Sequence, residues 1–127
     1  MDDYFSNHPG GRNSVLQFEF FLNQAMAAIP SDETAFPWRD STGYINFNML
    51  FDDRDNVTRS ASIALGLELR GDLVATSGYP KLAVFINHAH GDEKLEQIYG
   101  KDKLTHLADL KNIWDPNHIF SYNNRLP

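Results

Sequence analysis

Three stretches of the chain have the side-chain pattern of β-strands. Residues 14–22 (SVLQFEFFL) and 81–88 (KLAVFINH) are short and apolar without a helical period, which is typical of strands. Residues 43–51 (GYINFNMLF) alternate between two kinds of side chain. One side is mostly polar but uncharged: Tyr44, Asn46, Asn48 and Leu50. The other side is apolar and belongs to a core: Ile45, Phe47, Met49 and Phe51.

A period of 3.6 residues predicts a long helix over residues 56–75. Asp55 and Asn56 are both available as the N-cap of this helix. Gly66 and Gly71 each weaken a helix by roughly 1 kcal/mol relative to Ala. A kink or break at these glycines is therefore expected.

The C-terminal part of the chain predicts two further helices. The first is short and covers residues 93–99, and the second covers residues 101–114. The second has one apolar stripe at helical spacing: Leu104, Leu107, Leu110 and Ile113. Asp115-Pro116 ends it, because proline cannot continue a helix and its predecessor is displaced from the α region.

The order of these elements indicates one domain of the α+β class. We expect an antiparallel sheet with helices packed on one face. Residues 1–13 are polar and contain Pro9-Gly10-Gly11, so they are expected to form a flexible lead-in. Residues 14–127 show no repeat or linker and are expected to form a single domain.

Composition excludes several classes of function. The 127 residues carry a net charge of −6 and no Lys/Arg cluster, which argues against nucleic-acid binding. No run of about 18 apolar residues exists, so no membrane association is expected. The N-terminus lacks the bases and apolar run of a signal peptide, so a cytoplasmic location is expected. Cysteine is absent, which excludes disulfides and thiolate metal sites.

His88, His90 and Asp92 form the first group that could perform chemistry. Two histidines two residues apart on an extended segment would face the same side, which is metal-ligand spacing. The pattern overlaps HxHxD of metallo-β-lactamase-type hydrolases, but Glu93 stands where another His is needed. A strand end followed by a polar loop explains it more simply, and we expect no metal. Acid–base catalysis by the histidines, with Asp92 orienting them, is the functional hypothesis.

Two further groups could bind a substrate. The amides and phenol of Tyr44, Asn46 and Asn48 can hold a carbonyl or phenol oxygen, although a half-exposed strand would look the same. Trp38 and Arg39 form a loop anchor or, alternatively, a substrate clamp. Glu19 lies within an apolar strand, where burial would raise the pKa of its carboxyl, or it faces solvent. No nucleotide-binding glycine motif occurs in the chain.

Three separated motifs together resemble FAD-linked oxidases of the berberine-bridge type. The first is residues 29–39 (IPSDETAFPWR), which resemble "PPDATAFPHR", and the second is residues 85–88 (FINH), which resemble "YVNY". The third is the C-terminal segment, with its Tyr99-Gly100, its Asp115-Pro116-Asn117 and its Asn123-Asn124. The resemblance runs from about residue 14 to residue 127 and implies the end of the family's substrate domain and its tail.

The resemblance also implies what should differ. Family members have a large FAD-binding region before this part, and the printed sequence contains no counterpart. Their catalytic carboxylate follows the tyrosine of the second strand, a place that Ile45 holds beside Tyr44. Asn123 resembles a family asparagine that lies near the flavin. Strand edges taken from a larger sheet need partners, so we expect a homodimer.

These expectations lead to one main hypothesis and three alternatives. The main one is a flavin-independent enzyme of secondary metabolism that cyclises, isomerises or dehydrates an apolar polyketide- or terpenoid-like molecule. Its acid–base groups would be His88, His90 and Asp92, and its substrate-binding residues are the following: Trp38, Arg39, Tyr44, Asn46, Asn48 and Asn123. The alternatives are a fragment or partner subunit of an FAD-dependent oxidoreductase, a non-catalytic accessory module, and a metal-dependent hydrolase.

Overall fold

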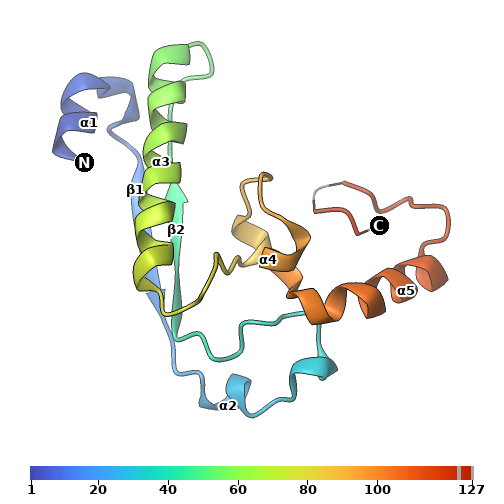
Figure 1. Cartoon of the computed structure of the whole chain (residues 1–127). Coiled ribbons are helices and arrows are strands. Elements are labelled where there is room, and N and C mark those ends of the chain that lie inside the picture. The colour runs from blue at the N-terminus through green and yellow to red at the C-terminus, as the bar shows by residue number, and fades with distance from the viewer. Residues whose placement is uncertain (123, 127) are drawn as a thin grey trace. The chain divides into compact units, whose positions relative to one another are not determined.

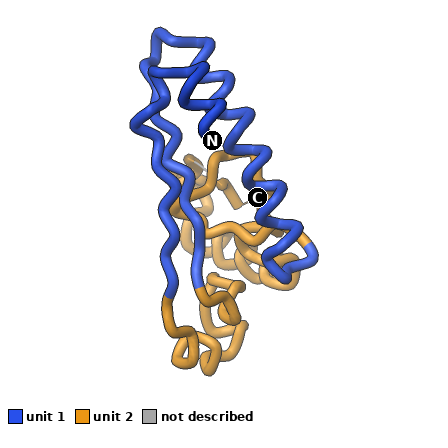
Figure 2. Tube along the Cα trace, turned by 90° about the vertical axis from the view of Figure 1, so that its left-hand side faces the viewer, with its two compact units in different colours: residues 1–20, 43–80 blue, residues 21–42, 81–127 orange. Residues whose placement is uncertain are grey.

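The computed structural model describes residues 1–122 and 124–126, which divide into two compact units (Figure 2). Unit 1 comprises residues 1–20 and 43–80, and unit 2 comprises residues 21–42 and 81–127. The mixture of helices with an antiparallel strand pair confirms the predicted α+β class.

Unit 1 is built on a hairpin of two antiparallel strands (Figure 1). Strand β1 (Val15–Phe20) pairs with strand β2 (Gly43–Asn48), so both strands predicted in this part of the chain are confirmed. Phe18 lies opposite Ile45, and Glu19 lies opposite Tyr44. Because side chains alternate along a strand, Glu19 and Tyr44 share one side of the sheet while Ile45 belongs to the other.

The long helix α3 (Asn56–Thr76) runs beside this hairpin in both views of the chain (Figures 1 and 2). Asp55 is its N-cap, because a side-chain oxygen of Asp55 accepts a hydrogen bond of 2.9 Å from the Thr58 N–H. The helix continues through Gly66 and Gly71, so the break expected there is wrong. Packing beside the hairpin explains its continuity, since helices in proteins depend more on packing than on propensity.

The first 13 residues contain helix α1 (Asp2–Asn7) and the 3₁₀ turn η1 (Pro9–Gly11), in contrast to the flexible lead-in predicted from their composition. Tyr4 is buried, and its hydroxyl lies 2.6 Å from the hydroxyl of Ser62 on α3. Gly11 is buried against the Tyr4 ring, where any side chain would overlap the phenol. A single aromatic anchor thus holds a segment whose composition is mostly polar.

Unit 2 contains helices joined by irregular segments. The helices are α2 (Gln24–Ala27), α4 (Leu95–Tyr99) and α5 (Leu104–Trp114), and the 3₁₀ turns are η2 (Ser31–Glu33), η3 (Ile86–His88) and η4 (Lys101–Lys103). The two predicted C-terminal helices are confirmed, with η4 forming the first turn of the second.

The third predicted strand, residues 81–88, is wrong for the described structure. This segment is irregular and ends in η3, although the Val84 N–H donates to the Gln97 carbonyl at 2.9 Å. A strand forms only when a neighbouring strand accepts its hydrogen bonds, and the described part of the chain supplies none at this position. Val84 and Ile98 are nevertheless buried and supply the apolar core of unit 2.

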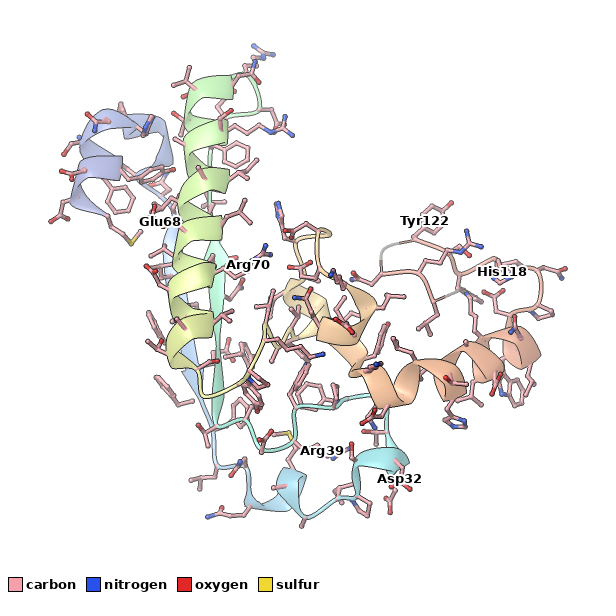
Figure 3. The ribbon with its side chains drawn as sticks, viewed as in Figure 1. Asp32, Arg39, Glu68, Arg70, His118 and Tyr122 are labelled. Carbon is pink, nitrogen blue, oxygen red and sulfur yellow. The ribbon has the colours of Figure 1, made fainter. Side chains whose placement is uncertain are left out.

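Helix α5 ends at the predicted place, and the Asp115 carboxylate organises the tail that follows. It accepts hydrogen bonds from the Ile119 N–H at 2.7 Å, from the Phe120 N–H at 3.1 Å, and from the Lys111 ammonium. Lys111 also donates to the Phe120 carbonyl. The chain therefore turns back at the helix end, and His118 and Tyr122 lie on the tail that this turn creates (Figure 3).

Candidate functional site

The side of the hairpin that carries Tyr44 has two groups of side-chain hydrogen bonds. We call it the polar face, and it consists of Gln17, Glu19, Tyr44, Asn46 and Asn48. The Tyr44 hydroxyl donates to Glu19 Oε2 at 2.6 Å, and Gln17 Nε2 donates to Glu19 Oε1 at 2.6 Å. Asn46 Nδ2 donates to Asn48 Oδ1 at 3.3 Å. Both oxygens of the Glu19 carboxylate therefore have a donor on the same face.

The environment of Tyr44 raises the pKa of its phenol above the ordinary value of 10.0. The hydrogen bond to Glu19 has the largest effect, because it favours the protonated phenol, and burial and the negative charge of Glu19 act in the same direction. Tyr44 is therefore a neutral hydrogen-bond donor throughout the physiological pH range.

Alternation within residues 43–51 correctly predicts that Tyr44, Asn46 and Asn48 share a face, while their role in substrate binding stays a prediction. The structure adds Glu19 as the partner of Tyr44. Ile45, at the family's position for a carboxylate, lies on the opposite side of the sheet from Tyr44. The carboxylate beside this tyrosine thus comes from the neighbouring strand.

The predicted catalytic histidines do not lie on an extended strand. His88 is in η3 with its ring centroid 5.5 Å from that of Phe85, and His90 is in the following loop. The strand geometry from which a common orientation was expected is therefore not present at these residues. Among the residues that the structure describes, no three His, Asp or Glu side chains are grouped to hold a metal ion. Acid–base roles for His88, His90 and Asp92 stay predictions.

Glu93 shapes this loop in a way that sequence reasoning missed. Its carboxylate accepts hydrogen bonds from the His90 N–H at 3.0 Å and the Gly91 N–H at 2.8 Å. Burial acts to raise the pKa of Glu93, but these backbone hydrogen bonds outweigh it and the pKa is lowered. The sequence feature that could have indicated this role is Gly91, two residues before Glu93. Gly91 has a φ of 106°, which glycine adopts readily, and this conformation turns the chain back toward the Glu93 carboxylate.

Arg39 lies at a pocket of about 390 Å³ in unit 2, which is widely open to solvent and is called the cavity below. Its Nη1 donates to the Met26 carbonyl at 3.2 Å, and its Nη2 donates to the Thr34 hydroxyl. The Trp38 carbonyl accepts hydrogen bonds from both the N–H and the hydroxyl of Ser41. Both proposed roles of this loop, anchor and clamp, are compatible with this geometry. Asn123, the remaining predicted substrate-binding residue, lies outside the described residues.

Comparison with known proteins finds a family model that matches the C-terminal third of the chain. The family model "Berberine and berberine like" matches residues 84–127, which include the tail organised by Asp115. The predicted resemblance to the FAD-linked oxidases is thereby confirmed.

Nearly the whole chain is similar to fungal FAD-linked oxidoreductases. It is 44% identical over 124 residues to FAD-linked oxidoreductase srdI of Neurospora crassa, covering 98% of this chain and 25% of that protein. It is 43% identical over 129 residues to FAD-linked oxidoreductase OXR1 of Pyricularia oryzae, covering 100% of this chain and 25% of that protein. The chain thus spans about a quarter of the length of these relatives. No solved structure gives a significant match.

The names of these relatives raise the question of whether the described residues fit FAD. A flavin dinucleotide needs a cradle for its pyrophosphate, usually a glycine-rich turn between a strand and a helix. Here residues 21–23 (FLN) connect β1 to α2, and residues 49–55 (MLFDDRD) connect β2 to α3. Neither connection has a glycine, and three aspartates in the second would repel a pyrophosphate. Neither of these connections therefore offers a pyrophosphate cradle of this kind, and the chemistry proposed below uses protein groups alone.

No helix of the described residues has the length and apolar character needed to cross a membrane.

Proposed function

We propose that this chain is a flavin-independent enzyme that moves a proton on an apolar small molecule bound at the polar face. The observation that carries the proposal is the 2.6 Å hydrogen bond between the Tyr44 hydroxyl and the Glu19 carboxylate. It joins a base to a neutral donor on one rigid face, which is the pairing that enolisation of a carbonyl compound requires. Cyclisation, isomerisation and dehydration can each proceed through such a step where the polyketide- or terpenoid-like molecule carries a carbonyl group.

In the proposed step, a Glu19 oxygen takes a proton from the carbon next to a substrate carbonyl. The electron pair of that C–H bond moves to the carbonyl oxygen, which becomes an enolate. The Tyr44 hydroxyl, released from Glu19 as the latter becomes protonated, donates its hydrogen bond to this oxygen. Asn46 and Asn48 supply amide donors that orient further oxygens of the substrate. Return of the proton to a different carbon completes an isomerisation.

The proposal is tested with a carbon acid, 2-acetylcyclohexanone, in D₂O. The rate of deuterium incorporation next to the carbonyl, followed by NMR, reports proton abstraction. We expect Glu19→Gln to lower the catalysed rate by roughly 10²–10⁴-fold, the usual contribution of a general base. Glu33→Gln removes the same charge from an exposed residue of unit 2 and is the matched control. Exchange by Glu19→Gln at the wild-type rate would remove Glu19 from the mechanism.

The same experiment also tests the predicted acid–base roles of His88, His90 and Asp92. If the histidine segment performs the chemistry, His88→Ala loses exchange while Glu19→Gln retains it. If the polar face performs it, the opposite result is expected. Circular dichroism of each variant checks that it stays folded.

A second candidate function is that of a part of an FAD-linked oxidoreductase. The observation that favours it is the identity of 42–44% to proteins with that name over nearly the whole chain. In that case the polar face would bind the substrate, and hydride acceptance would belong to a flavin held by residues other than those described here. Flavin content of the protein separates the two candidates.

A further inference from the structure

We propose that the cavity around Arg39 binds a small carboxylate attached to an apolar body. The site is separate from the polar face, because all of its residues belong to unit 2. Its walls are short apolar side chains with one cation among them: Ala27, Ala28, Ile29, Pro30, Pro37 and Arg39. Ser31 and Asp40 complete the lining.

The size and composition of the cavity suit a small organic molecule. A volume of about 390 Å³ lies within the range that small-molecule sites occupy, roughly 300–1,000 Å³. Such sites are mainly apolar and contain a few polar groups that fix orientation. Apolar walls with one guanidinium have this character.

The guanidinium of Arg39 is held in place by two hydrogen bonds and has further N–H donors that these bonds do not use. Its bonds to the Met26 carbonyl and the Thr34 hydroxyl use one N–H of each terminal nitrogen. An arginine has five N–H donors, so one remains on each of these nitrogens and one on Nε. The Nε is buried and has no hydrogen-bond partner among the described residues. A fixed guanidinium with unused donors is the group that binds carboxylates most specifically in proteins.

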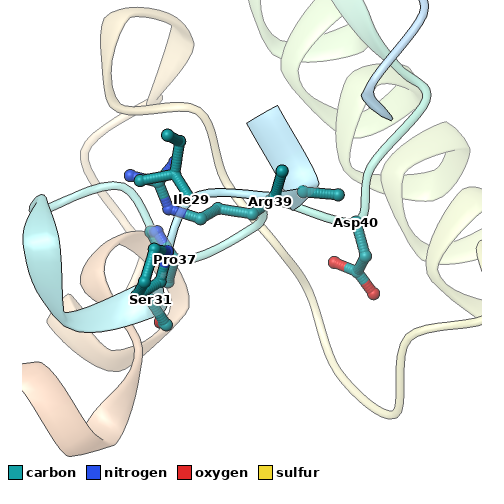
Figure 4. Close-up of a pocket in the computed structure, with 8 residues that line it drawn as sticks. Ile29, Ser31, Pro37, Arg39 and Asp40 are labelled. Atoms are coloured by element: carbon teal, nitrogen blue, oxygen red, sulfur yellow. The ribbon is translucent and has the colours of Figure 1, made fainter. Parts of the chain in front are cut away.

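The charges around the cavity are compatible with an anion. Asp40 also lines it, but its carboxylate points away from the Arg39 guanidinium, which extends toward Ile29 and Pro37 (Figure 4). The walls nearest the guanidinium are uncharged. An anionic group bound there would therefore lie closer to the Arg39 guanidinium than to the Asp40 carboxylate.

The test is a titration of the full chain with sodium benzoate, followed by the amide NMR signals of residues 27–40. Benzamide, which has the same shape without the charge, is titrated in parallel. We expect saturable shifts with benzoate and at least about tenfold weaker binding of benzamide, because a charged hydrogen bond contributes roughly a factor of ten. Arg39→Gln should weaken benzoate binding by a similar factor. Lys101→Gln, an exposed charge outside the cavity, should leave it unchanged.

A second pair of variants covers the case in which loss of Arg39 unfolds unit 2. Ile29 is 41% exposed at the cavity wall, and Ile113 is 66% exposed elsewhere in the same unit. Ile29→Glu should abolish benzoate binding by placing a carboxylate beside the site, whereas Ile113→Glu should not.

Three results would each overturn the assignment: equal affinity for benzoate and benzamide, benzoate binding that survives Ile29→Glu, or inorganic phosphate binding as well as benzoate. The outcome is independent of the proton-transfer proposal, since no variant here touches Glu19 or Tyr44. Absence of benzoate binding to the wild-type chain, together with normal deuterium exchange, would therefore refute this site alone.

Discussion

The pKa of the Tyr44 phenol reports on its hydrogen bond with Glu19 across the hairpin. Glu19 raises the pKa of Tyr44 through the hydrogen bond that its carboxylate accepts and through its negative charge. Because the protonated phenol is the favoured form, this stabilisation is complete below pH 10.0 and disappears as the pH rises through the raised pKa. Glu19→Gln removes the charge, so we expect the pKa of Tyr44 to fall toward 10.0, as measured by ultraviolet or NMR titration. An unchanged titration curve would mean that the pair does not form in solution.

The pKa of the Asp115 carboxylate is a second property that the surrounding residues change. Its hydrogen bond with Lys111 lowers its pKa most, burial opposes this, and the N–H groups of Ile119 and Phe120 lower the pKa further. The resulting stabilisation is present above the ordinary value of 3.8 and is lost as the pH falls through the lowered pKa.

Asp115→Asn should therefore release the tail at neutral pH. An amide carries no charge to form an ion pair with the Lys111 ammonium, and it has only one accepting oxygen. We expect hydrogen exchange of the Ile119 and Phe120 amides to quicken by roughly tenfold, the effect of losing a charged hydrogen bond. Asp109→Asn, an exposed change on the same helix, is the control and should leave both amides as they are. Equal protection in the two variants would show that another contact holds the tail.

The site residues differ in how far the sequence could identify them. Alternation alone assigned Tyr44 and its two asparagine neighbours to one face, because a strand has a strict period of two. It could not pair Tyr44 with Glu19, since that depends on the register between the two strands, and these residues are 25 positions apart in the chain. A different limit applies to Glu93, whose bonds to His90 and Gly91 are local but depend on the conformation of the glycine.

At the scale of elements, the sequence correctly predicted the features that depend on interactions within about one turn of the chain. The N-cap Asp55 and the Asp115-Pro116 stop gave the helix limits because capping and proline act within one turn. The prediction of a strand over residues 81–88 was wrong because an apolar run does not show whether a neighbouring strand is present to pair with it. The helix at residues 2–7 was missed because the contact that buries Tyr4, its hydrogen bond with Ser62, spans 58 residues.

Two glycines of unit 1 should respond in opposite directions to alanine. Nothing lies within 4 Å of a Cβ added to Gly71 in α3, so Gly71→Ala should stabilise the fold by about 1 kcal/mol through helix propensity. A Cβ on Gly11 would overlap the Tyr4 phenol, so Gly11→Ala should cost about 1–3 kcal/mol. Denaturant unfolding measures both. Equal effects of the two substitutions would contradict the docking of residues 1–13 on α3.

At the scale of the whole molecule, the hairpin leaves apolar surface exposed. Phe18 is 55% exposed and Phe20 is 81% exposed, and β1 has one unpaired edge among the described residues. We propose that a second copy of the chain covers it. Antiparallel pairing of two β1 strands about Phe18 would place Gln17 of each copy opposite Glu19 of the other, which brings amide and carboxylate together without like charges.

This assembly predicts a dimer mass for the wild-type chain in light scattering. Phe18→Lys should shift the protein to monomers, because it places two ammonium groups opposite each other at the centre of the interface. Phe36→Lys, a ring of unit 2 outside the hairpin, is the control for the added charge. A wild-type monomer at all concentrations would leave the exposed hairpin surface for a different partner.

The central claim is that the chain performs its chemistry with protein groups rather than with flavin. The measurement that tests it most directly is the visible absorption spectrum of the purified chain, recorded before and after incubation with FAD and gel filtration. We predict a colourless protein in both cases, because the strand-to-helix connections of the described residues have no glycine and one of them carries three aspartates. Flavin bands that co-elute with the protein would contradict this account and favour the oxidoreductase function.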